Sequence, residues 1–260
     1  ISSAEPNLQN IPVRTPLGRE LRKMFVAKDG CVLVDADYSQ IELRVLAHIS
    51  GDENLCNAFK NNEDIHTATA SGVFGVAPDE VTPVMRSRAK TVNFGIIYGM
   101  GDFSLAKDLG ISVREAREYI ENYFARYPGV KRYMEHIIET TKESGFVSTM
   151  FDRRRPIPEI NSSNFMVRSA GERMAHNTPI QGSAADIIKI AMIKVSRRLK
   201  EEKLRSRLIL QVHDELIIEA PKDEAEHVSK LLTECMESAV KLSVPLVAET
   251  KTGHSWYDTK

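Results

Sequence analysis

The sequence predicts an α+β fold, a small sheet with a long helical insertion between its strands. Three observations support this fold class. Short apolar runs typical of strands lie near both ends of the 260-residue chain. Helical periodicity dominates residues 39–203. Hydrophobic residues make up 42% and charged residues 27% of the chain, close to globular averages, so a packed core is expected rather than disorder.

Composition excludes several classes of protein. The 35 basic and 36 acidic residues leave a net charge of −1, which neither indicates nor excludes a nucleic-acid partner. The three cysteines are far apart and form no CxxC pair, which argues against a disulfide framework or a zinc ribbon. No apolar run reaches 18 residues, so no membrane-spanning helix is expected. Because the chain starts with Ile1, we expect it to be a fragment of a longer protein.

The first elements follow from local composition. Residues 1–22 contain three prolines and predict an irregular segment. The apolar run 31–34 predicts a strand that breaks into acidic residues, and Ser39 then begins a helix that ends near Gly51. Ser112 and Glu115 have the spacing of a capping box at the start of a later helix.

The spacing of apolar residues predicts the remaining helices and strands. Helices are expected at 64–74, 84–99, 112–127, 129–144, 163–177, 179–203 and 221–242. A short hairpin is expected near 147–158, and strands at 207–212, 216–220 and 246–250. Pro179 is expected to separate two of these helices, and Gly99 to end another.

Two aspartates stand where predicted strands end. Asp37 closes the first strand, and Asp214 lies between two others at the tip of a predicted hairpin. If the strands are neighbours, both carboxylates meet at one edge of the sheet, an arrangement that suits Mg²⁺. The alternative is that turns simply favour Asp. His213-Asp214-Glu215 contains no Gly or Asn, so a tight two-residue type I′ hairpin is a poor fit there.

Asp35 lies two residues before Asp37 and therefore on the same face of the predicted strand. It is either a third metal ligand or a solvated residue at the end of the strand. We favour the solvated position.

A second candidate feature is a stripe on the helix expected at 84–99. Arg86, Lys90, Phe94 and Tyr98 recur at steps of four and so lie along one face of the helix. The two cations can bind a triphosphate, and the two rings can stack on a base. The alternative is a half-buried helix whose long basic side chains reach solvent.

These segments resemble the conserved motifs of family A DNA polymerases, the bacterial DNA polymerase I type. Residues 37–44 (DYSQIELR) are similar to motif A, residues 86–99 (RSRAKTVNFGIIYG) to motif B, and residues 211–215 (QVHDE) to motif C. Residues 6–12 (PNLQNIP) and 179–186 (PIQGSAAD) also match the family. Several long motifs in the right order are far more specific than one alone.

The resemblance implies an architecture. The chain would hold a palm, with a small antiparallel sheet flanked by helices, and a mainly helical fingers insertion. The palm would cover residues 1–63 and 161–260, and the fingers residues 64–160. The thumb and exonuclease domains of such an enzyme are absent from this chain and would lie upstream in the full-length polypeptide.

The resemblance also implies an activity, the addition of dNMP from dNTP to a primer 3′-OH with release of pyrophosphate. Asp37 and Asp214 would bind two Mg²⁺ ions, with Mn²⁺ as a substitute, and the Tyr38 carbonyl would be a further ligand. Glu215 would support the site. Lys90 would act as general acid toward pyrophosphate.

Further positions match the family's substrate contacts. Residues expected at the dNTP are Arg86, Lys90, Phe94, Tyr98, Gln40, His66 and Glu42, the last as a steric gate against ribose. Residues expected at the primer–template DNA are Asn10, Arg14, Arg173, Gln181 and His213.

Two alternatives remain at this stage. One alternative to an active polymerase is a fragment that binds dNTP or primer–template with little activity of its own. The other is a metal-dependent nuclease. The stripe of cations and rings favours a polymerase, since a hydrolase has no need to stack a templated base. We expect a monomer in the cytoplasm, at the nucleoid, acting in DNA replication and repair, with no membrane partner.

Overall fold

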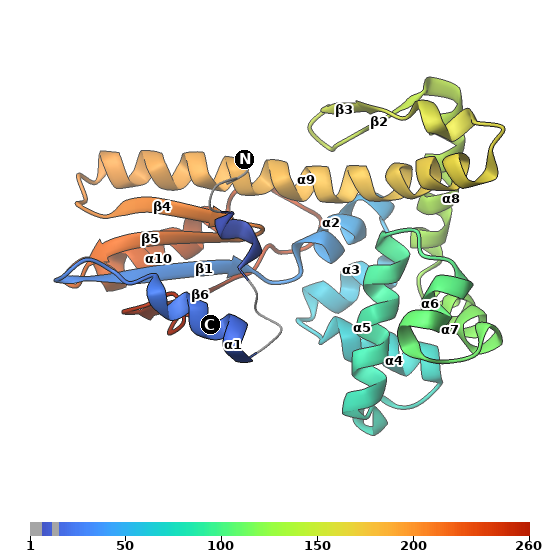
Figure 1. The fold of residues 1–260 in the computed structure, drawn as a ribbon, viewed down its shortest axis with the longest axis horizontal. Coiled ribbons are helices and arrows are strands. Elements are labelled where there is room, and N and C mark those ends of the chain that lie inside the picture. The colour runs from blue at the N-terminus through green and yellow to red at the C-terminus, as the bar shows by residue number, and fades with distance from the viewer. Residues whose placement is uncertain (1–6, 12–15) are drawn as a thin grey trace. The chain divides into compact units, whose positions relative to one another are not determined.

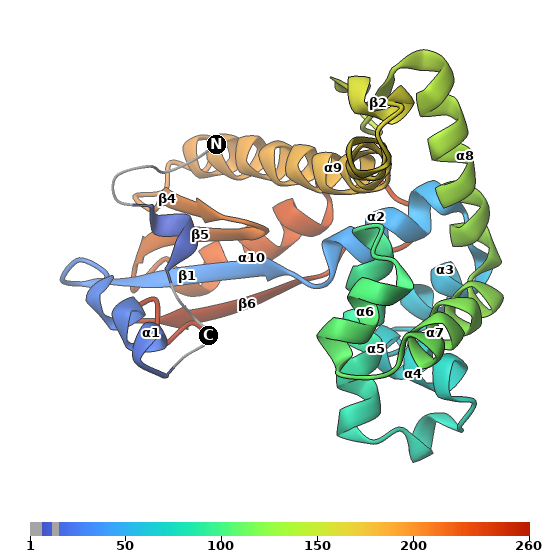
Figure 2. The same ribbon diagram turned by 45° about the vertical axis from the view of Figure 1, so that its right-hand side comes forward.

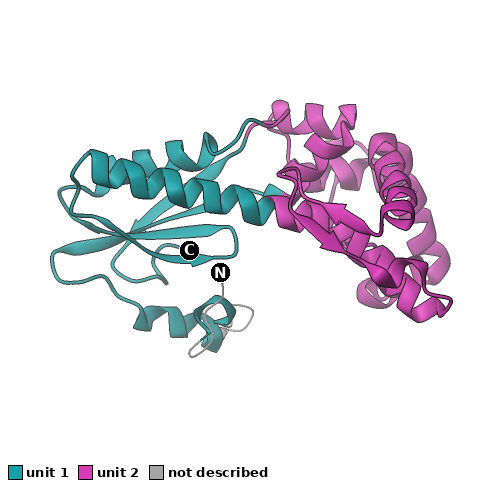
Figure 3. Cartoon of the chain, turned by 90° about the horizontal axis from the view of Figure 1, so that it is seen from above, with its two compact units in different colours: residues 1–41, 184–241, 246–260 teal, residues 42–183, 242–245 magenta. Residues whose placement is uncertain are grey.

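The computed structural model describes residues 7–11 and 16–260, and the chain is an α+β protein, as the sequence predicts (Figure 1). It divides into two compact units, coloured separately in Figure 3. Unit 1 comprises residues 1–41, 184–241 and 246–260, and unit 2 comprises residues 42–183 and 242–245.

Unit 1 is built on a four-stranded antiparallel sheet. Its strands are β1 (Cys31–Tyr38), β4 (Arg207–Val212), β5 (Glu215–Pro221) and β6 (Ala248–Gly253), in the spatial order β4-β5-β1-β6. Helix α10 (Ala225–Glu237) packs on β1 and β6. Figure 1 shows β1, from the start of the chain, lying between strands from its end.

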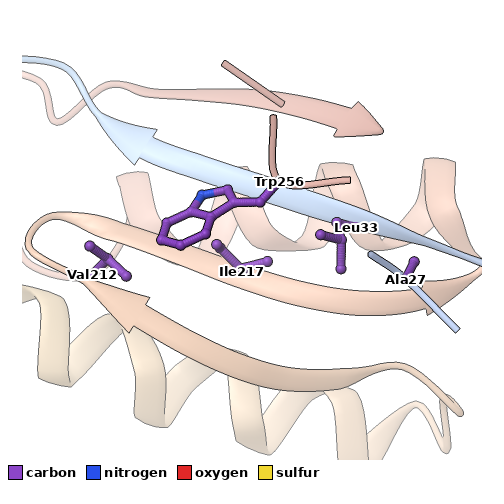
Figure 4. Close-up of a cluster of buried hydrophobic side chains, with 5 residues drawn as sticks. All are labelled: Ala27, Leu33, Val212, Ile217 and Trp256. Atoms are coloured by element: carbon purple, nitrogen blue, oxygen red, sulfur yellow. The ribbon is translucent and has the colours of Figure 1, made fainter. Parts of the chain in front are cut away.

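The two faces of this sheet differ in chemistry because side chains alternate along each strand. Tyr38, on the face toward α10, donates its hydroxyl hydrogen to the Met236 carbonyl at 2.6 Å. On the opposite face, Leu33 and Ile217 pack with Trp256, the one tryptophan of the sequence (Figure 4). Asp35 and Asp37 have the same parity as Leu33 and so belong to the Trp256 face.

Unit 2 is mainly helical. Its helices are α2 (Ile41–Ser50), α3 (Glu53–Lys60), α4 (Ile65–Phe74), α5 (Pro83–Ile97), α6 (Asp102–Leu109), α7 (Val113–Arg126) and α8 (Pro128–Ser144). Helix α4 packs on both α5 and α7, and α6 packs on α7 (Figure 2). A short hairpin of β2 (Phe146–Ser148) and β3 (Arg154–Pro156) follows α8. The expected hairpin is therefore confirmed.

Helix ends in unit 2 follow from local side chains. The predicted capping box is confirmed: Ser112 Oγ accepts the Glu115 N–H at 3.2 Å, and Glu115 Oε2 accepts the Ser112 N–H at 2.9 Å. Gly99 adopts φ +62° just after α5, which is the left-handed conformation expected at a helix end.

The Ser112→Ala variant is expected to lose about 1 kcal/mol of unfolding free energy, the usual cost of removing an N-cap hydroxyl. Urea denaturation of the two proteins measures this difference. Thr140→Ala, in the interior of α8, is a suitable control, because alanine there improves helix propensity. Equal effects of both substitutions would show that the cap contributes nothing specific.

Two expectations about elements are wrong. A single helix, α9 (Phe165–Glu201), runs through Pro179, where a break was predicted. A proline costs one hydrogen bond and crowds the carbonyl four residues earlier, here that of the small, buried Ala175. Buried side chains on both sides, including Ile180, keep the helix continuous.

The described part of the N-terminal segment is also more ordered than predicted. It forms a short helix, α1 (Pro16–Glu20), and the 3₁₀ turns Leu8–Asn10 and Leu21–Met24, where an irregular segment was expected. Two further 3₁₀ turns lie at Pro78–Glu80 and Pro158–Asn161.

Several element ends differ by a few residues from those predicted. Helix α2 begins at Ile41 and not at Ser39, because Gln40 has φ +55° and cannot be helical. Strand β1 continues through the acids to Tyr38, since both neighbours pair with it along that stretch. Helix α10 is shorter than the predicted 221–242. In the described residues, no helix has the length and apolar character needed to cross a membrane.

Candidate functional site

The register of the sheet in unit 1 brings the predicted acids together. Asp37 on β1 lies directly opposite Glu215 on β5. The Tyr38 N–H donates to the Asp214 carbonyl at 3.2 Å, so Asp214 also lies beside the end of β1. The strands that carry Asp37 and Asp214 are therefore neighbours, the condition under which the sequence predicts that the two carboxylates meet.

The turn that carries Asp214 is tighter than expected. Val212 pairs with Glu215, which leaves a two-residue loop of His213 and Asp214. The sequence argued against a type I′ loop, which needs positive φ at both residues, because neither residue is Gly or Asn. Of the two, only His213 has a positive φ, of +51°. A left-handed residue without the freedom of glycine is strained, and such strain is common at functional sites.

The surroundings of the Asp37 carboxyl favour binding of a cation. Burial raises its pKa to about 6, and the nearby Asp214 carboxyl adds to this shift. Its Oδ1 atom is buried and has no hydrogen-bond partner among the described residues. An unpartnered carboxylate oxygen beside a second carboxylate is a poor arrangement without a positive charge, and its hard oxygens suit Mg²⁺.

Asp35 belongs to the same cluster and is only 2% exposed, so the favoured prediction of a solvated residue is wrong. Its Oδ2 accepts the Thr259 hydroxyl at 2.8 Å and lies 3.5 Å from Lys260 Nζ. Burial, and then the Glu215 charge, raise the pKa of Asp35 to about 8.

Lys260 is the cation of this cluster, and no pattern in the sequence indicates it. Its Nζ lies 2.8 Å from Glu215 Oε2 and 3.7 Å from Asp37 Oδ2. Glu215 also accepts the Trp256 indole N–H at 2.6 Å through Oε1. Lys260 thus bridges three acids, and Trp256 and Thr259 hold two of them from the same segment.

A cavity of about 490 Å³ opens beside these acids. Asp37, Asp214, Glu215 and Lys260 line it. Arg22 also lines it, and its guanidinium lies 4.3 Å from the centre of the Trp256 ring. Within residues 7–11 and 16–260, no three His, Cys, Asp or Glu side chains are grouped to hold a metal, so an ion here needs further oxygen ligands.

Unit 2 carries the predicted stripe on α5. Arg86 and Lys90 are exposed, whereas the Phe94 and Tyr98 rings are half-buried and stacked, with centroids 6.4 Å apart. Arg86 Nε donates to Asp64 Oδ2 at 2.5 Å. Burial opposes the ionisation of Asp64, but hydrogen bonds from Arg86, Thr67 and the His66 N–H together outweigh it and lower the pKa of Asp64 to about 2. The cations are therefore accessible, and Arg86 already binds a carboxylate.

Glu42 and Tyr98 meet within unit 2. The Tyr98 hydroxyl donates to Glu42 Oε2 at 3.3 Å. Burial raises the pKa of Glu42, while hydrogen bonds from Tyr98 and Gln181 oppose that shift. Glu42, predicted as the steric gate, thus forms one hydrogen-bonded group with Tyr98, predicted to stack on a base, and Gln181, predicted to contact DNA.

The other predicted residues are placed as follows. His66 lies in the first turn of α4, and burial lowers its pKa to about 4. Arg173 is exposed and donates to Ser169 Oγ at 2.9 Å. Asn10 is exposed. Arg14 lies outside the described residues.

Comparison with known proteins gives a consistent result. Residues 1–258 match the family model described as DNA polymerase family A. The chain is 59% identical over 261 residues to DNA polymerase I of Bacillus caldotenax, and 57% identical over 260 residues to that of Caldicellulosiruptor bescii. These matches cover 100% of the chain but only 30% and 31% of the two relatives.

A solved structure agrees with these relatives. The POL domain of Pol1 from M. smegmatis, in complex with DNA primer-template and dNTP, superposes with a TM-score of 0.96 at 48% sequence identity. The match covers 99% of this chain and 46% of that chain.

Proposed function

Because this chain belongs to DNA polymerase family A, we propose that it is the catalytic core of a DNA-directed DNA polymerase. It adds dNMP from dNTP to a primer 3′-OH, directed by a template, and releases pyrophosphate. The observation that carries this proposal is the pairing of β1 with β5, which places Asp37 and Asp214 at one end of the sheet.

Family A DNA polymerases are metal-dependent, and we propose two Mg²⁺ ions here, with Mn²⁺ as a substitute. Asp37, Asp214 and the Tyr38 carbonyl bind them. The ions supply charge neutralisation and activation of the primer hydroxyl. Glu215 supports this group, and its bonds to Lys260 and Trp256 fix its position.

In unit 2, Arg86 and Lys90 bind the phosphates of the dNTP, and Lys90 protonates the leaving pyrophosphate. The exchange of Asp64 for a phosphate on Arg86 is chemically simple, since both are oxygen anions that suit a guanidinium. Phe94 stacks near the incoming nucleotide and Tyr98 near the template base. Gln40 shapes the nucleotide pocket.

Contacts with primer–template DNA are assigned to Asn10, Arg14, Arg173, Gln181 and His213. Donors such as Arg173 and Gln181 suit the minor groove, whose acceptors are shared by all base pairs. They can therefore test the geometry of a pair without reading its sequence.

We also propose domain boundaries, an oligomeric state and a cellular location. It places the palm at residues 1–63 and 161–260 and the fingers at 64–160. It also places a monomeric enzyme in the cytoplasm, at the nucleoid, joined to thumb and exonuclease domains.

A primer-extension assay with Mg²⁺ and dNTPs on a short primer–template tests the activity. We expect the product to follow the template base and pyrophosphate to be released. Shortening of the primer would favour a nuclease instead. The chain spans about 30% of its relatives, which supports a second candidate, a fragment that only binds. Binding of dNTP without extension would favour that candidate.

The gate can be tested in the same assay. Glu42→Ala is expected to lower the preference for dNTP over NTP by roughly 10- to 100-fold, since a pocket without steric exclusion rejects an added hydroxyl weakly. Glu42→Gln keeps the size of the side chain and should keep the preference. If both variants accept NTP equally well, exclusion depends on the charge of Glu42 and not on its volume.

A further inference from the structure

A chain of buried hydrogen bonds lies beneath His66 in unit 2. His66 Nδ1 is 3.1 Å from Asn93 Nδ2, and Asn93 Oδ1 is 3.1 Å from Thr69 Oγ1. Thr69 Oγ1 is in turn 3.2 Å from the Tyr127 hydroxyl. Asn93 and Thr69 are 0% exposed and Tyr127 is 1% exposed, so solvent does not compete for these bonds.

The donor of every link follows from the orientation of the Asn93 amide, whose nitrogen faces His66 and whose oxygen faces Thr69. An amide nitrogen only donates, so His66 Nδ1 must be the acceptor of the bond from Asn93. The single hydroxyl hydrogen of Thr69 goes to Asn93 Oδ1, so Tyr127 must donate to Thr69. The Arg126 guanidinium, which only donates, also interacts with the Tyr127 hydroxyl. The chain therefore runs in one direction, toward His66.

This direction decides where the proton of His66 lies. A neutral imidazole carries one N–H, and with Nδ1 accepting a bond that hydrogen is on Nε2. Among the described residues, Nε2 is not one of the buried nitrogen atoms that lack a hydrogen-bond partner. Within residues 7–11 and 16–260, His66 makes no hydrogen bond through Nε2. A donor is thus left for a ligand.

The surroundings of His66 also favour the neutral ring. Burial, with smaller contributions from the charges of Arg86 and Lys90 on α5, lowers its pKa to about 4 against the opposing charge of Asp64 at the N-cap of α4. The Phe94 ring lies 6.2 Å away and carries no charge. A third cation beside Arg86 and Lys90 would be repelled, whereas a neutral donor is not.

We propose that Tyr127, Thr69 and Asn93 are positioning residues that fix His66 as a neutral Nε2–H donor to a phosphate oxygen of the incoming nucleoside triphosphate. His66 would then recognise the phosphate by one directed hydrogen bond and not by charge. The phosphate ligand rests on the proposed function, but the position of the proton does not.

Nuclear magnetic resonance of the ¹⁵N-histidine-labelled chain tests the position of the proton. The His66 signals are assigned by their loss in His66→Asn. We expect Nδ1 without a proton and Nε2 with one, unchanged between pH 6 and pH 8. A proton on Nδ1 in this range, as the other tautomer or as imidazolium, would overturn the proposal.

Substitutions of Asn93 and Thr69 test whether these residues determine the position of the proton. Asn93→Asp replaces the donor with an acceptor of the same shape, so Nδ1 should become protonated. Thr69→Val, which removes the bond that orients Asn93, should give a mixture of tautomers. Thr141→Val is the control, because it removes another fully buried hydroxyl of unit 2 and leaves the hydrogen bonds from Tyr127 to His66 intact. An unprotonated Nδ1 in a folded Asn93→Asp protein would contradict the inference.

Inorganic tripolyphosphate is the probe for the ligand. Its addition should shift the Nε2–H signal of the wild-type protein and leave Nδ1 unprotonated. Thr69→Val should bind it about fivefold more weakly, the value of about one neutral hydrogen bond. Binding without a shift of Nε2–H would exclude His66 as the donor. Primer extension by the wild-type chain, measured separately, shows whether the proposed function itself holds.

Discussion

Asp214→Ala is expected to reduce templated incorporation of nucleotides by about 10³- to 10⁴-fold. A bound metal ion contributes several kcal/mol to a phosphoryl-transfer transition state, and each 1.36 kcal/mol is a factor of ten in rate. Asp37→Ala is expected to have an effect of the same size, because the two carboxyls lie together at the end of the β1–β5 pair. Single-turnover primer extension measures both losses.

Folding should survive these substitutions. The pKa of Asp37 is raised, so its ionised form is disfavoured in the folded protein, and removing that carboxylate relieves repulsion from Asp214. The melting temperature at pH 8 is therefore expected to stay the same or to rise. Asp29→Ala, in the exposed turn before β1, is the control and should keep full activity. Retained activity in either Asp37→Ala or Asp214→Ala would contradict the two-metal assignment.

Lys260→Met is expected to have the largest effect on stability, a loss of about 2 kcal/mol. Breaking a buried ion pair costs roughly 3–5 kcal/mol, and Lys260 keeps 34% exposure, so solvent screens part of that cost. The substitution leaves the buried carboxyls of Asp35 and Glu215 without their cation. Urea denaturation measures the loss.

The size of this loss should depend on pH. The pKa of Asp35 is raised from its usual value near 4 to about 8, so the folded state holds this proton more tightly than the unfolded state. Ionisation of Asp35 therefore costs stability as pH rises from about 4 to about 8. Lys260 offsets that cost, so the variant should lose more at pH 9 than at pH 5.

Two comparisons define this prediction. Lys230→Met removes an exposed ion pair with Glu226 and should change the stability little at either pH. Asp35→Asn combined with Lys260→Met should recover part of the stability at pH 9. A loss from Lys260→Met that is equal at both pH values would show that Lys260 acts through packing and not through the Asp35 charge.

The candidate site could be predicted in part from sequence. The motif residues Asp37, Asp214 and Arg86 can be proposed from sequence, as can the stripe that continues to Tyr98, because each lies in a short local pattern. The two-residue loop of His213 and Asp214 cannot, because residue preference alone does not reveal when a sheet holds His at φ +51°. The predicted helix break at Pro179 fails for a similar reason, since packing of buried side chains on both sides of it outweighs the cost of one lost hydrogen bond.

The α+β class, the capping box at Ser112 and the choice of Asp37 and Asp214 as candidate ligands can be predicted without a structure, since they depend on periodicity and on spacings of a few residues. The burial of Asp35 and its pairing with Lys260 are evident only from contacts in the folded protein. The same holds for the orientation of His66 by Asn93. Such contacts join residues far apart in the chain, and their partners are selected by strand register and helix packing, which no local pattern encodes.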